Sequence, residues 1–232
     1  MGDNINILVT GGAGFIGSNI VEELCSSGRF KSIRVLDDLS TGKLSNIQPF
    51  LDSHSNVEFV HGSITDLEVC RSAVDGMDVV CHQAALGSVP RSIGDPLGTH
   101  AANVNGFLNI LVAARDAGIK RVVYASSSSV YGDHPALPKR EQETGEVLSP
   151  YAATKAIDEI YAGVFTKCYD MECIGLRYFN VFGPRQDPNG AYAAVIPKFI
   201  QMMKAGERPV INGDGTFSRD FTHVSNVVQA NL

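Results

Sequence analysis

The stretch Thr10-Gly11-Gly12-Ala13-Gly14-Phe15-Ile16-Gly17 decides the fold of this chain. It directly follows an apolar run at residues 5–9, and a helical pattern over residues 14–27 comes next. Its glycines match G-x-G-x-x-G, a pattern that is specific when it joins a strand to a helix. Glycine allows a tight turn close to a pyrophosphate, and the helix N-terminus supplies free N–H groups. The stretch predicts a dinucleotide site with contacts from Gly11, Gly14, Phe15, Ile16 and Gly17; the alternative is a glycine-rich turn without a ligand.

Short β-branched runs alternate with amphipathic stretches along the rest of the chain. We expect strands at residues 5–9, 33–37, 57–60, 79–82, 122–126 and 173–178. We expect helices at residues 14–27, 67–75, 99–117 and 150–168. Strands with little polar interruption, separated by helices, imply a parallel sheet that is covered on both faces. Right-handed crossovers then give an α/β fold, a doubly wound parallel Rossmann sheet, over residues 1–180.

The amino-acid composition changes after residue 180. Residues 182–215 carry four prolines and five glycines, with one helical pattern at 195–204. This composition predicts a small, loop-rich lobe over residues 181–232, with residues 221–232 able to return to the first domain. The last ten residues have a helical apolar pattern without a stop signal. We therefore expect this lobe to be the incomplete start of a substrate-binding unit in a longer protein.

Composition narrows the possible functions. Of the 232 residues, 44% are hydrophobic and 19% are charged, with a net charge of −6 that disfavours binding to nucleic acid or to anionic membranes. No apolar stretch approaches the roughly 20 residues that span a bilayer. The five cysteines form no CxxC pair, so we expect buried thiols in a reducing compartment, the cytoplasm. No histidine spacing suggests a metal, and His82 is expected to be a hydrogen-bonded residue at a strand end.

Two neighbouring aspartates end the second predicted strand. Asp37 lies 20 residues beyond Gly17, where an acidic residue is expected to accept the ribose hydroxyls of a dinucleotide. A carboxylate at this position would repel a 2′-phosphate, which favours NAD over NADP. Asp38 could share the role. A turn-forming aspartate is the alternative for either residue.

A tyrosine and a lysine share one face of the helix predicted at residues 150–168. Ser149 is a good N-cap and Pro150 suits the first helical position, so Tyr151 lies in the first turn and Lys155 one turn later. Free tyrosine titrates near pH 10, but a nearby ammonium, an oxidised nicotinamide and the helix N-terminus all favour the phenolate. The pair therefore predicts a base that works near neutral pH. The alternative is a surface feature, because this spacing is common on helices.

Four consecutive serines, residues 126–129, support the catalytic interpretation. They end the strand predicted at 122–126, and ligands bind at the carboxyl ends of strands in such sheets. A hydroxyl there can bond a reacting sugar oxygen and pass its proton towards the tyrosine. A polar turn after a strand is the alternative.

In combination these motifs resemble the extended short-chain dehydrogenase/reductase family, specifically its nucleotide-sugar 4-epimerases. The resemblance runs from residue 5 to the end, and residues 185–197 look most like epimerases of UDP-N-acetylglucosamine or its uronic acid. Further matching motifs are Asn103-Val104-Asn105-Gly106, Val130-Tyr131-Gly132, Leu176-Arg177-Tyr178-Phe179-Asn180-Val181-Phe182-Gly183-Pro184 and Arg219-Asp220-Phe221.

The resemblance implies a role for each matching residue. Tyr151 would remove the proton of the sugar 4-hydroxyl, Lys155 would lower the pKa of Tyr151 and hold the nicotinamide ribose, and Ser127 would relay the proton. Bound NAD would take a hydride from carbon 4 and return it to the opposite face. Tyr178 would lie near the nicotinamide, and Asp37, Asp38, Ser63, Ile64, Gln83, Ala84, Ala85 and Asn103 would also contact the cofactor. The UDP-sugar would meet Ser88, Ser128, Ser129, Asn180, Val195 and Arg219.

The substrate and the reaction stay open within this resemblance. The sugar pair could be the N-acetylated one, glucose and galactose, or the uronic acids. Related dehydratases and decarboxylases carry a carboxylate where this chain has Ser129, which favours an epimerase. A non-catalytic protein that binds NAD and a nucleotide sugar is the other alternative. At 62–64 the chain reads Gly-Ser-Ile, whereas the family often has an aspartate after the glycine. The family also implies a homodimer.

Overall fold

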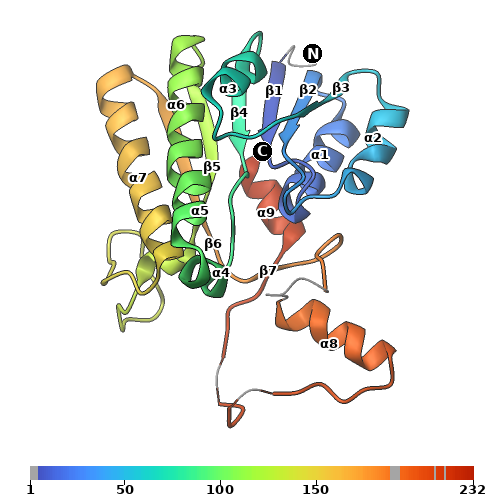
Figure 1. The fold of residues 1–232 in the computed structure, drawn as a ribbon, viewed down its shortest axis with the longest axis vertical. Coiled ribbons are helices and arrows are strands. Elements are labelled where there is room, and N and C mark those ends of the chain that lie inside the picture. Colours follow the sequence, from blue (N-terminus) through green and yellow to red (C-terminus); the bar gives the residue numbers. More distant parts are fainter. Residues whose placement is uncertain (1–4, 189–193, 212, 217) are drawn as a thin grey trace.

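The computed structural model describes residues 5–188, 194–211, 213–216 and 218–232. At its centre lies a parallel sheet of six strands, formed by the described residues in the order β3-β2-β1-β4-β5-β6 (Figure 1). The strands are β1 (Ile5–Thr10), β2 (Phe30–Asp37), β3 (Val57–His61), β4 (Val79–His82), β5 (Arg121–Ser127) and β6 (Glu172–Tyr178). The chain runs outward from β1 in one direction and then from β4 in the other, so the order reverses between these two strands. This confirms the predicted doubly wound Rossmann fold.

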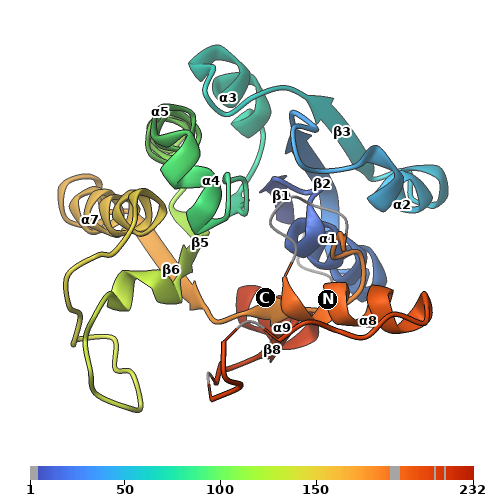
Figure 2. The ribbon, with the colours of Figure 1, turned by 60° about the horizontal axis from the view of Figure 1, so that its bottom comes forward.

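Helices α3 (Leu67–Val74), α6 (Gly106–Asp116) and α7 (Pro150–Tyr169) cover one face of the sheet (Figure 2). Phe107, Ile110 and Leu111 of α6 are fully buried there, and Phe165 of α7 joins the same cluster. This packing fixes α7, with its tyrosine and lysine, against the sheet beside β5 and β6.

Helices α1 (Phe15–Ser27), α2 (Gln48–Ser53) and α9 (Val224–Asn231) cover the opposite face. Ile20, Val21 and Leu24 of α1 pack with Val9 of β1 and Ile33 of β2 in this second core. Helix α9 packs against α1 and contributes Val224 and Val228 to this core. The last helix of the chain therefore belongs spatially with the sheet rather than with the lobe that precedes it.

The single helix expected at residues 99–117 is divided in the structure. It consists of α5 (Pro96–His100), a π-helical segment η2 (Ala101–Asn105) and α6, and α4 (Val89–Gly94) precedes it. The π segment turns Asn103 inward, where its Nδ2 donates to Thr154 Oγ1 on α7 at 3.0 Å. Such segments interrupt helices mostly at functional sites. The short helices η1 (Leu44–Asn46) and η3 (Ser128–Tyr131) complete this domain.

The lobe after β6 is small. β7 (Val181–Phe182) pairs in parallel with β8 (Thr222–His223), and α8 (Val195–Lys204), predicted with these bounds, stands apart from the sheet (Figure 1). The loop after β7 is attached to the first domain, because Asn19 Nδ2 donates to Pro184 O at 3.0 Å and Arg185 Nε donates to Ser18 Oγ at 3.0 Å.

The cysteines differ from the expectation of uniform burial. Cys70 and Cys81 are buried and Cys25 and Cys173 are partly buried, but Cys168 is exposed. Cys168 lies in the last turn of α7, beyond the part of the helix that packs on the sheet, so its thiol faces solvent.

Candidate active site

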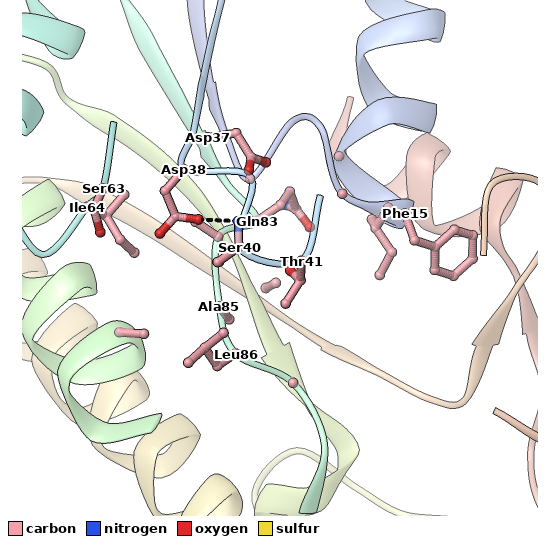
Figure 3. A pocket seen from close by; sticks show the side chains of 18 of the residues that line it. Phe15, Asp37, Asp38, Ser40, Thr41, Ser63, Ile64, Gln83, Ala85 and Leu86 are labelled. Atoms are coloured by element: carbon pink, nitrogen blue, oxygen red, sulfur yellow. Dashed lines mark hydrogen bonds between the residues drawn. The ribbon is translucent and has the colours of Figure 1, made fainter. Parts of the chain in front are cut away.

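A cavity of about 540 Å³ opens at the carboxyl ends of β1, β2, β3, β4 and β5. Figure 3 shows how side chains from several of these strand ends surround it, with Asp37 and Asp38 at and after the end of β2, Ser63 and Ile64 after β3, and Ala85 and Leu86 after β4. Its size is that of a pocket for a small molecule or cofactor. The predicted residues on its wall are Gly11, Gly14, Phe15, Ile16, Gly17, Asp37, Asp38, Ser63, Ile64, Gln83, Ala84, Ala85, Ser127, Tyr151, Lys155 and Tyr178.

The glycine turn forms the floor of this cavity. Gly11 has a positive φ of 67° and its N–H donates to Leu36 O at 2.8 Å, which ties the turn to β2. A side chain at Gly11 would meet the backbone N of Ala84 at 2.6 Å, so only glycine fits. Helix α1 starts after Gly14 without a side-chain cap. The residues of its first turn line the cavity, and their N–H groups are free of a side-chain cap, which suits an anion such as a pyrophosphate.

Asp37 supports the turn as well as lining the cavity. Its carboxylate is 8% exposed and accepts hydrogen bonds from Ala13 N at 3.0 Å and Leu39 N at 2.8 Å. Burial raises the pKa of Asp37, and these two backbone bonds act against the rise. A carboxylate has about four lone-pair positions, so positions remain for ribose hydroxyls. The neighbouring Asp38 is exposed and accepts from Ser40 N at 2.9 Å.

The helix α7 begins as the sequence predicts. Ser149 Oγ accepts from Ala152 N at 3.1 Å, and Pro150 occupies the first helical position. Tyr151 N donates to Ser92 Oγ on α4 at 3.0 Å, which fixes the start of the helix at the edge of the cavity. Tyr151 and Lys155 both lie on the cavity wall, together with the glycine turn. Tyr151 is therefore a cavity residue of intermediate burial rather than an exposed surface residue.

Ser127 ends β5 on the same wall. Its Oγ accepts from Ser129 N at 3.2 Å and from Ser129 Oγ at 2.9 Å. Because the oxygen accepts both bonds, the Ser127 proton is left to bond another group in the cavity. Ser129 is thus a hydrogen-bond donor to Ser127 and is not itself part of the cavity wall.

Lys155 is almost completely buried. Its side chain is 2% exposed, and Nζ donates to Ala125 O at 2.9 Å and to Asp158 Oδ2 at 3.2 Å. The sequence interpretation did not include Asp158, although a spacing of three residues on a helix places the two side chains on one face. Burial raises the pKa of Asp158 to about 6, and the charge of Lys155 acts against this rise.

Ser126, Glu159 and Arg177 link α7 to the last two strands of the sheet. Ser126 Oγ donates to Glu159 Oε1 at 2.5 Å, while Arg177 Nε and Nη2 donate to the two carboxylate oxygens at 2.9 and 2.7 Å. Burial tends to raise the pKa of Glu159, but the hydrogen bonds from Arg177 and Ser126 outweigh it and lower the pKa. This fork fixes the helix relative to the serine strand.

Replacing Glu159 by glutamine is expected to lower the free energy of unfolding by about 2 kcal/mol, because it leaves the half-buried Arg177 without its counter-charge. Urea unfolding measures the change. Glu172→Gln is a matched control, since its pair with Arg121 is more than half exposed on both sides and is expected to contribute less than about 1 kcal/mol. Equal losses in the two variants would contradict the prediction.

A polar cluster lies beside the cavity at the end of β6. The Tyr178 hydroxyl donates to Gln83 Oε1 at 3.1 Å and accepts from Asn231 Nδ2 at 2.8 Å. Burial raises the pKa of Tyr178. Asn231 lies on α9 and was not predicted. Nearby, His82 Nδ1 lies 2.8 Å from Thr10 Oγ1, and burial lowers the pKa of His82 to about 3, so the expected hydrogen-bonded residue at a strand end is confirmed.

Several predicted residues lie off the cavity wall formed by the described residues. Asn103 is buried behind the wall, where its Oδ1 accepts from Leu86 N at 2.8 Å. Ser88 caps α4 with a positive φ of 97°, and the Asn180 Nδ2 donates to Asp220 O at 2.9 Å. The others off the wall are Ser128, Ser129, Val195 and Arg219.

The wall also contains residues that the sequence interpretation missed. Ser40 and Thr41 follow the two aspartates after one intervening leucine, so their position beside a strand end was a usable signal. Ser126 is the first of the four consecutive serines noted above, but no contact was assigned to it. The remaining residues were likewise assigned no contact: Leu36, Gly62, Thr65, Leu86, Gly87, Gly98, Ala101, Ala102, Ala125 and Val181.

A doubly wound sheet with this glycine turn, an acidic residue at the end of β2 and a tyrosine–lysine pair on α7 defines a dinucleotide-dependent enzyme. Comparison with known proteins agrees. The sequence profile of the NAD dependent epimerase/dehydratase family matches residues 7–232. The chain belongs to this family. The predicted family resemblance, the class of nucleotide-sugar 4-epimerases and NAD as cofactor are thereby confirmed.

Individual relatives are similar over nearly the whole chain. UDP-glucose 4-epimerase of Mycolicibacterium smegmatis is 40% identical over 225 residues, which cover 96% of this chain and 71% of that protein. The structure of UDP-N-acetylglucosamine 4-epimerase from Methanobrevibacter ruminantium M1, in complex with UDP-N-acetylmuramic acid, has a TM-score of 0.93 and 43% identity, covering 99% of this chain and 72% of that one. A dTDP-glucose 4,6-dehydratase from Streptomyces venezuelae with NAD bound has a TM-score of 0.90 and 33% identity, covering 98% and 70%.

Within the described ranges, no helix combines the length and the apolar character needed to cross a bilayer.

Proposed function

We propose that this chain epimerises carbon 4 of a UDP-linked sugar, with UDP-N-acetylglucosamine and UDP-N-acetylgalactosamine as the preferred pair. The observation that carries the proposal is that Ser127, Tyr151 and Lys155 lie on the wall of one cavity with the glycine turn. A proton acceptor, a hydroxyl relay and a fixed cation thus converge where a dinucleotide would bind.

The residues of the cavity fit the cofactor of the family. The uncapped start of α1 suits the pyrophosphate, and Asp37 suits the adenosine ribose. When bound, NAD supplies reversible hydride transfer with the sugar carbon. Gln83, Ala84, Ala85 and Tyr178 also line the cavity and would hold the nicotinamide side, while Ser63 and Ile64 would hold the adenine.

Side chains of this protein carry out the proton transfer. Tyr151 takes the proton of the 4-hydroxyl, and the Lys155 ammonium favours the phenolate that accepts it. Ser127 donates to the same sugar oxygen, since its own oxygen is already occupied by two bonds from Ser129. Tyr151 returns the proton to the 4-oxygen once carbon 4 has received its hydride on the opposite face, which completes the inversion.

The choice of sugar rests on the sequence between residues 185 and 197. Residues 189–193 of this stretch lie outside the described residues, so the preference for the N-acetylated pair is supported by the sequence and by the 43% identical epimerase alone. Ser88, Ser128, Asn180, Val195 and Arg219 are proposed to contact the UDP-sugar. The arginine suits a pyrophosphate because of its charge and its forked donors.

A nucleotide-sugar dehydratase is the second candidate, because such an enzyme is among the similar structures. Dehydration needs an acid or base beyond the tyrosine. Ser129 stands where the resemblance places that carboxylate, and it bonds Ser127 instead. This position favours the epimerase. A homodimer is also proposed, through the exposed apolar residues Ile160 and Val164 of α7, which are 65% and 45% exposed.

The test is to incubate the NAD-loaded protein with UDP-glucose, UDP-N-acetylglucosamine and the corresponding uronic acids, and to resolve the products by chromatography. The proposal expects a 4-epimer from UDP-N-acetylglucosamine at the highest rate. A 4-keto-6-deoxy product, which has lost water, would overturn it in favour of the dehydratase, and absence of any product from all substrates would overturn the enzymatic assignment.

Replacing Asp37 by alanine is expected to weaken NAD binding by about tenfold or more, since a hydrogen bond to a charged group contributes about 1.5–3 kcal/mol. The effect on NADP should be smaller, because the variant also removes repulsion of the 2′-phosphate. Both cofactors should lose some affinity, since Asp37 also holds Ala13 in the glycine turn. Calorimetric titration measures the two affinities. Asp52→Ala is the control, since Asp52 is an exposed residue of α2 that lies off the cavity wall. Equal losses of NAD and NADP in Asp37→Ala would mean that another residue binds the ribose hydroxyls.

A further inference from the structure

Helix α7 carries a buried ion pair, of which the proposed reaction uses only the lysine. Asp158 is 1% exposed and Lys155 is 2% exposed, and their charged atoms lie 3.2 Å apart. The carboxylate uses one oxygen only. Among the described residues, its Oδ1 is fully buried and has no hydrogen-bond partner.

Such a pair contributes little to the stability of a fold. Removing two charges from water is unfavourable, and their attraction compensates only when the remaining lone pairs are also bonded. Here one carboxylate oxygen is left unbonded. Packing alone therefore does not explain why an aspartate occupies this buried position. The residue with which Asp158 pairs is the lysine of the proposed mechanism, which suggests a role in the site.

We propose that Asp158 is a positioning residue, which keeps Lys155 charged and fixed beside the cavity so that Tyr151 can ionise. The inference rests on the proposed function, in which Tyr151 is the base. A lysine buried to this degree without a counter-ion tends to lose its proton. Asp158 prevents that loss, and Ala125 O holds the same ammonium from β5.

The direct effect of Asp158 on Tyr151 has the opposite sign, because a negative charge disfavours a phenolate. Distance decides between the two effects. Tyr151 lies seven residues from Asp158, about 10 Å along the helix axis, whereas Lys155 Nζ lies 3.2 Å from the carboxylate. Coulomb energy falls with distance, so the effect of Asp158 on Lys155 is the larger one.

Other charged or titratable groups around the pair are few. Glu159 on α7 interacts electrostatically with both members of the pair, Tyr124 on β5 interacts with Asp158, and His82 on β4 interacts with Lys155. His82 is neutral near pH 7, since burial lowers its pKa to about 3. Glu159 is compensated by Arg177. Asp158 is therefore the counter-ion of Lys155.

The test is an ultraviolet titration of the Tyr151 phenolate in the NAD-loaded protein, read as the difference from Tyr151→Phe. Asp158→Asn is expected to raise the apparent pKa of Tyr151 by about one unit or more. Lys155→Met should raise it as well, and adding Asp158→Asn to Lys155→Met should produce no further rise. Asp158→Glu, which keeps the charge, should lie closer to the wild type. An unchanged or lowered pKa in Asp158→Asn overturns the proposal.

A second measurement on the unmodified protein covers the case in which Asp158→Asn fails to fold. Nuclear magnetic resonance of carbon-labelled lysine side chains should show Lys155 charged between pH 7 and pH 9, where a buried lysine without a counter-ion would titrate. A Lys155 signal that titrates in this interval overturns the proposal. Neither measurement involves a sugar, so a wild type without turnover would count against the proposed function alone.

Discussion

Replacing Tyr151 by phenylalanine is expected to lower kcat by about 10²–10⁴-fold, the range that a positioned acid or base contributes. The variant loses the phenolic oxygen that takes the sugar proton, but it keeps the aromatic ring. NAD binding and the fold should persist, because the contact that fixes the start of α7 is made by the Tyr151 backbone N–H on Ser92. Epimer formation under saturating substrate measures kcat, and bound NAD per chain measures cofactor retention.

Tyr161→Phe is the matched control for this experiment. It removes a phenolic oxygen from the same helix, but Tyr161 packs against the hydrophobic core on the far side of the cavity wall. Turnover in this variant should stay near the wild-type value. If Tyr151→Phe also turned over at a near wild-type rate, tyrosine would be removed from the mechanism.

The sequence was sufficient for the parts of the site that depend on local pattern. The glycine turn, the aspartates at the end of β2, and the cap and face of α7 are all specified by neighbours a few residues apart. Parallel strands then bring their carboxyl ends together, so predictions made on separate segments meet at one cavity. This explains why the wall contains residues from β1, β2, β3, β4 and β5 that were predicted independently.

The parts that could not be predicted depend on contacts between distant segments. Asn231 and Tyr178 are 53 residues apart in the sequence, and their hydrogen bond forms only because α9 packs against the sheet. The division of the expected helix at residues 99–117 has a similar origin. A side chain at Gly106 would meet Ile64 at 2.5 Å, so the helix approaches the loop after β3 more closely than a helical pattern can indicate.

Asp158 illustrates a third limit. Its spacing from Lys155 was visible in the sequence, but an aspartate on an amphipathic helix is ordinarily a solvated residue. Asp158 becomes a candidate for the site only because its side chain is 99% buried. Burial results from the packing of α7 against β5 and α6, which the sequence pattern outlines but does not resolve to one side chain.

The glycine turn offers the prediction with the largest effect on the cofactor. In Gly17→Ala the new Cβ would lie 2.2 Å from Gly11 O and 2.7 Å from Gly12 Cα. Both are backbone atoms of the turn, so no side chain can move aside and the start of α1 must shift away from β1. We expect NAD affinity to fall by about 100-fold, equivalent to about 2.8 kcal/mol, and the free energy of unfolding to fall by about 1–3 kcal/mol.

Gly163→Ala is the control, because the added Cβ would meet no atom within 4 Å in the middle of α7. It should leave NAD affinity unchanged and raise the free energy of unfolding by about 0.5–1 kcal/mol, since glycine in a helix interior destabilises relative to alanine. The amount of bound NAD and the free energy of unfolding in urea are measured on both variants. The comparison distinguishes the steric clash at Gly17 from a general effect of adding a methyl group. If Gly17→Ala bound NAD as the wild type does, the first turn of α1 would not be the pyrophosphate site, and the cofactor would have to be held by the strand ends alone.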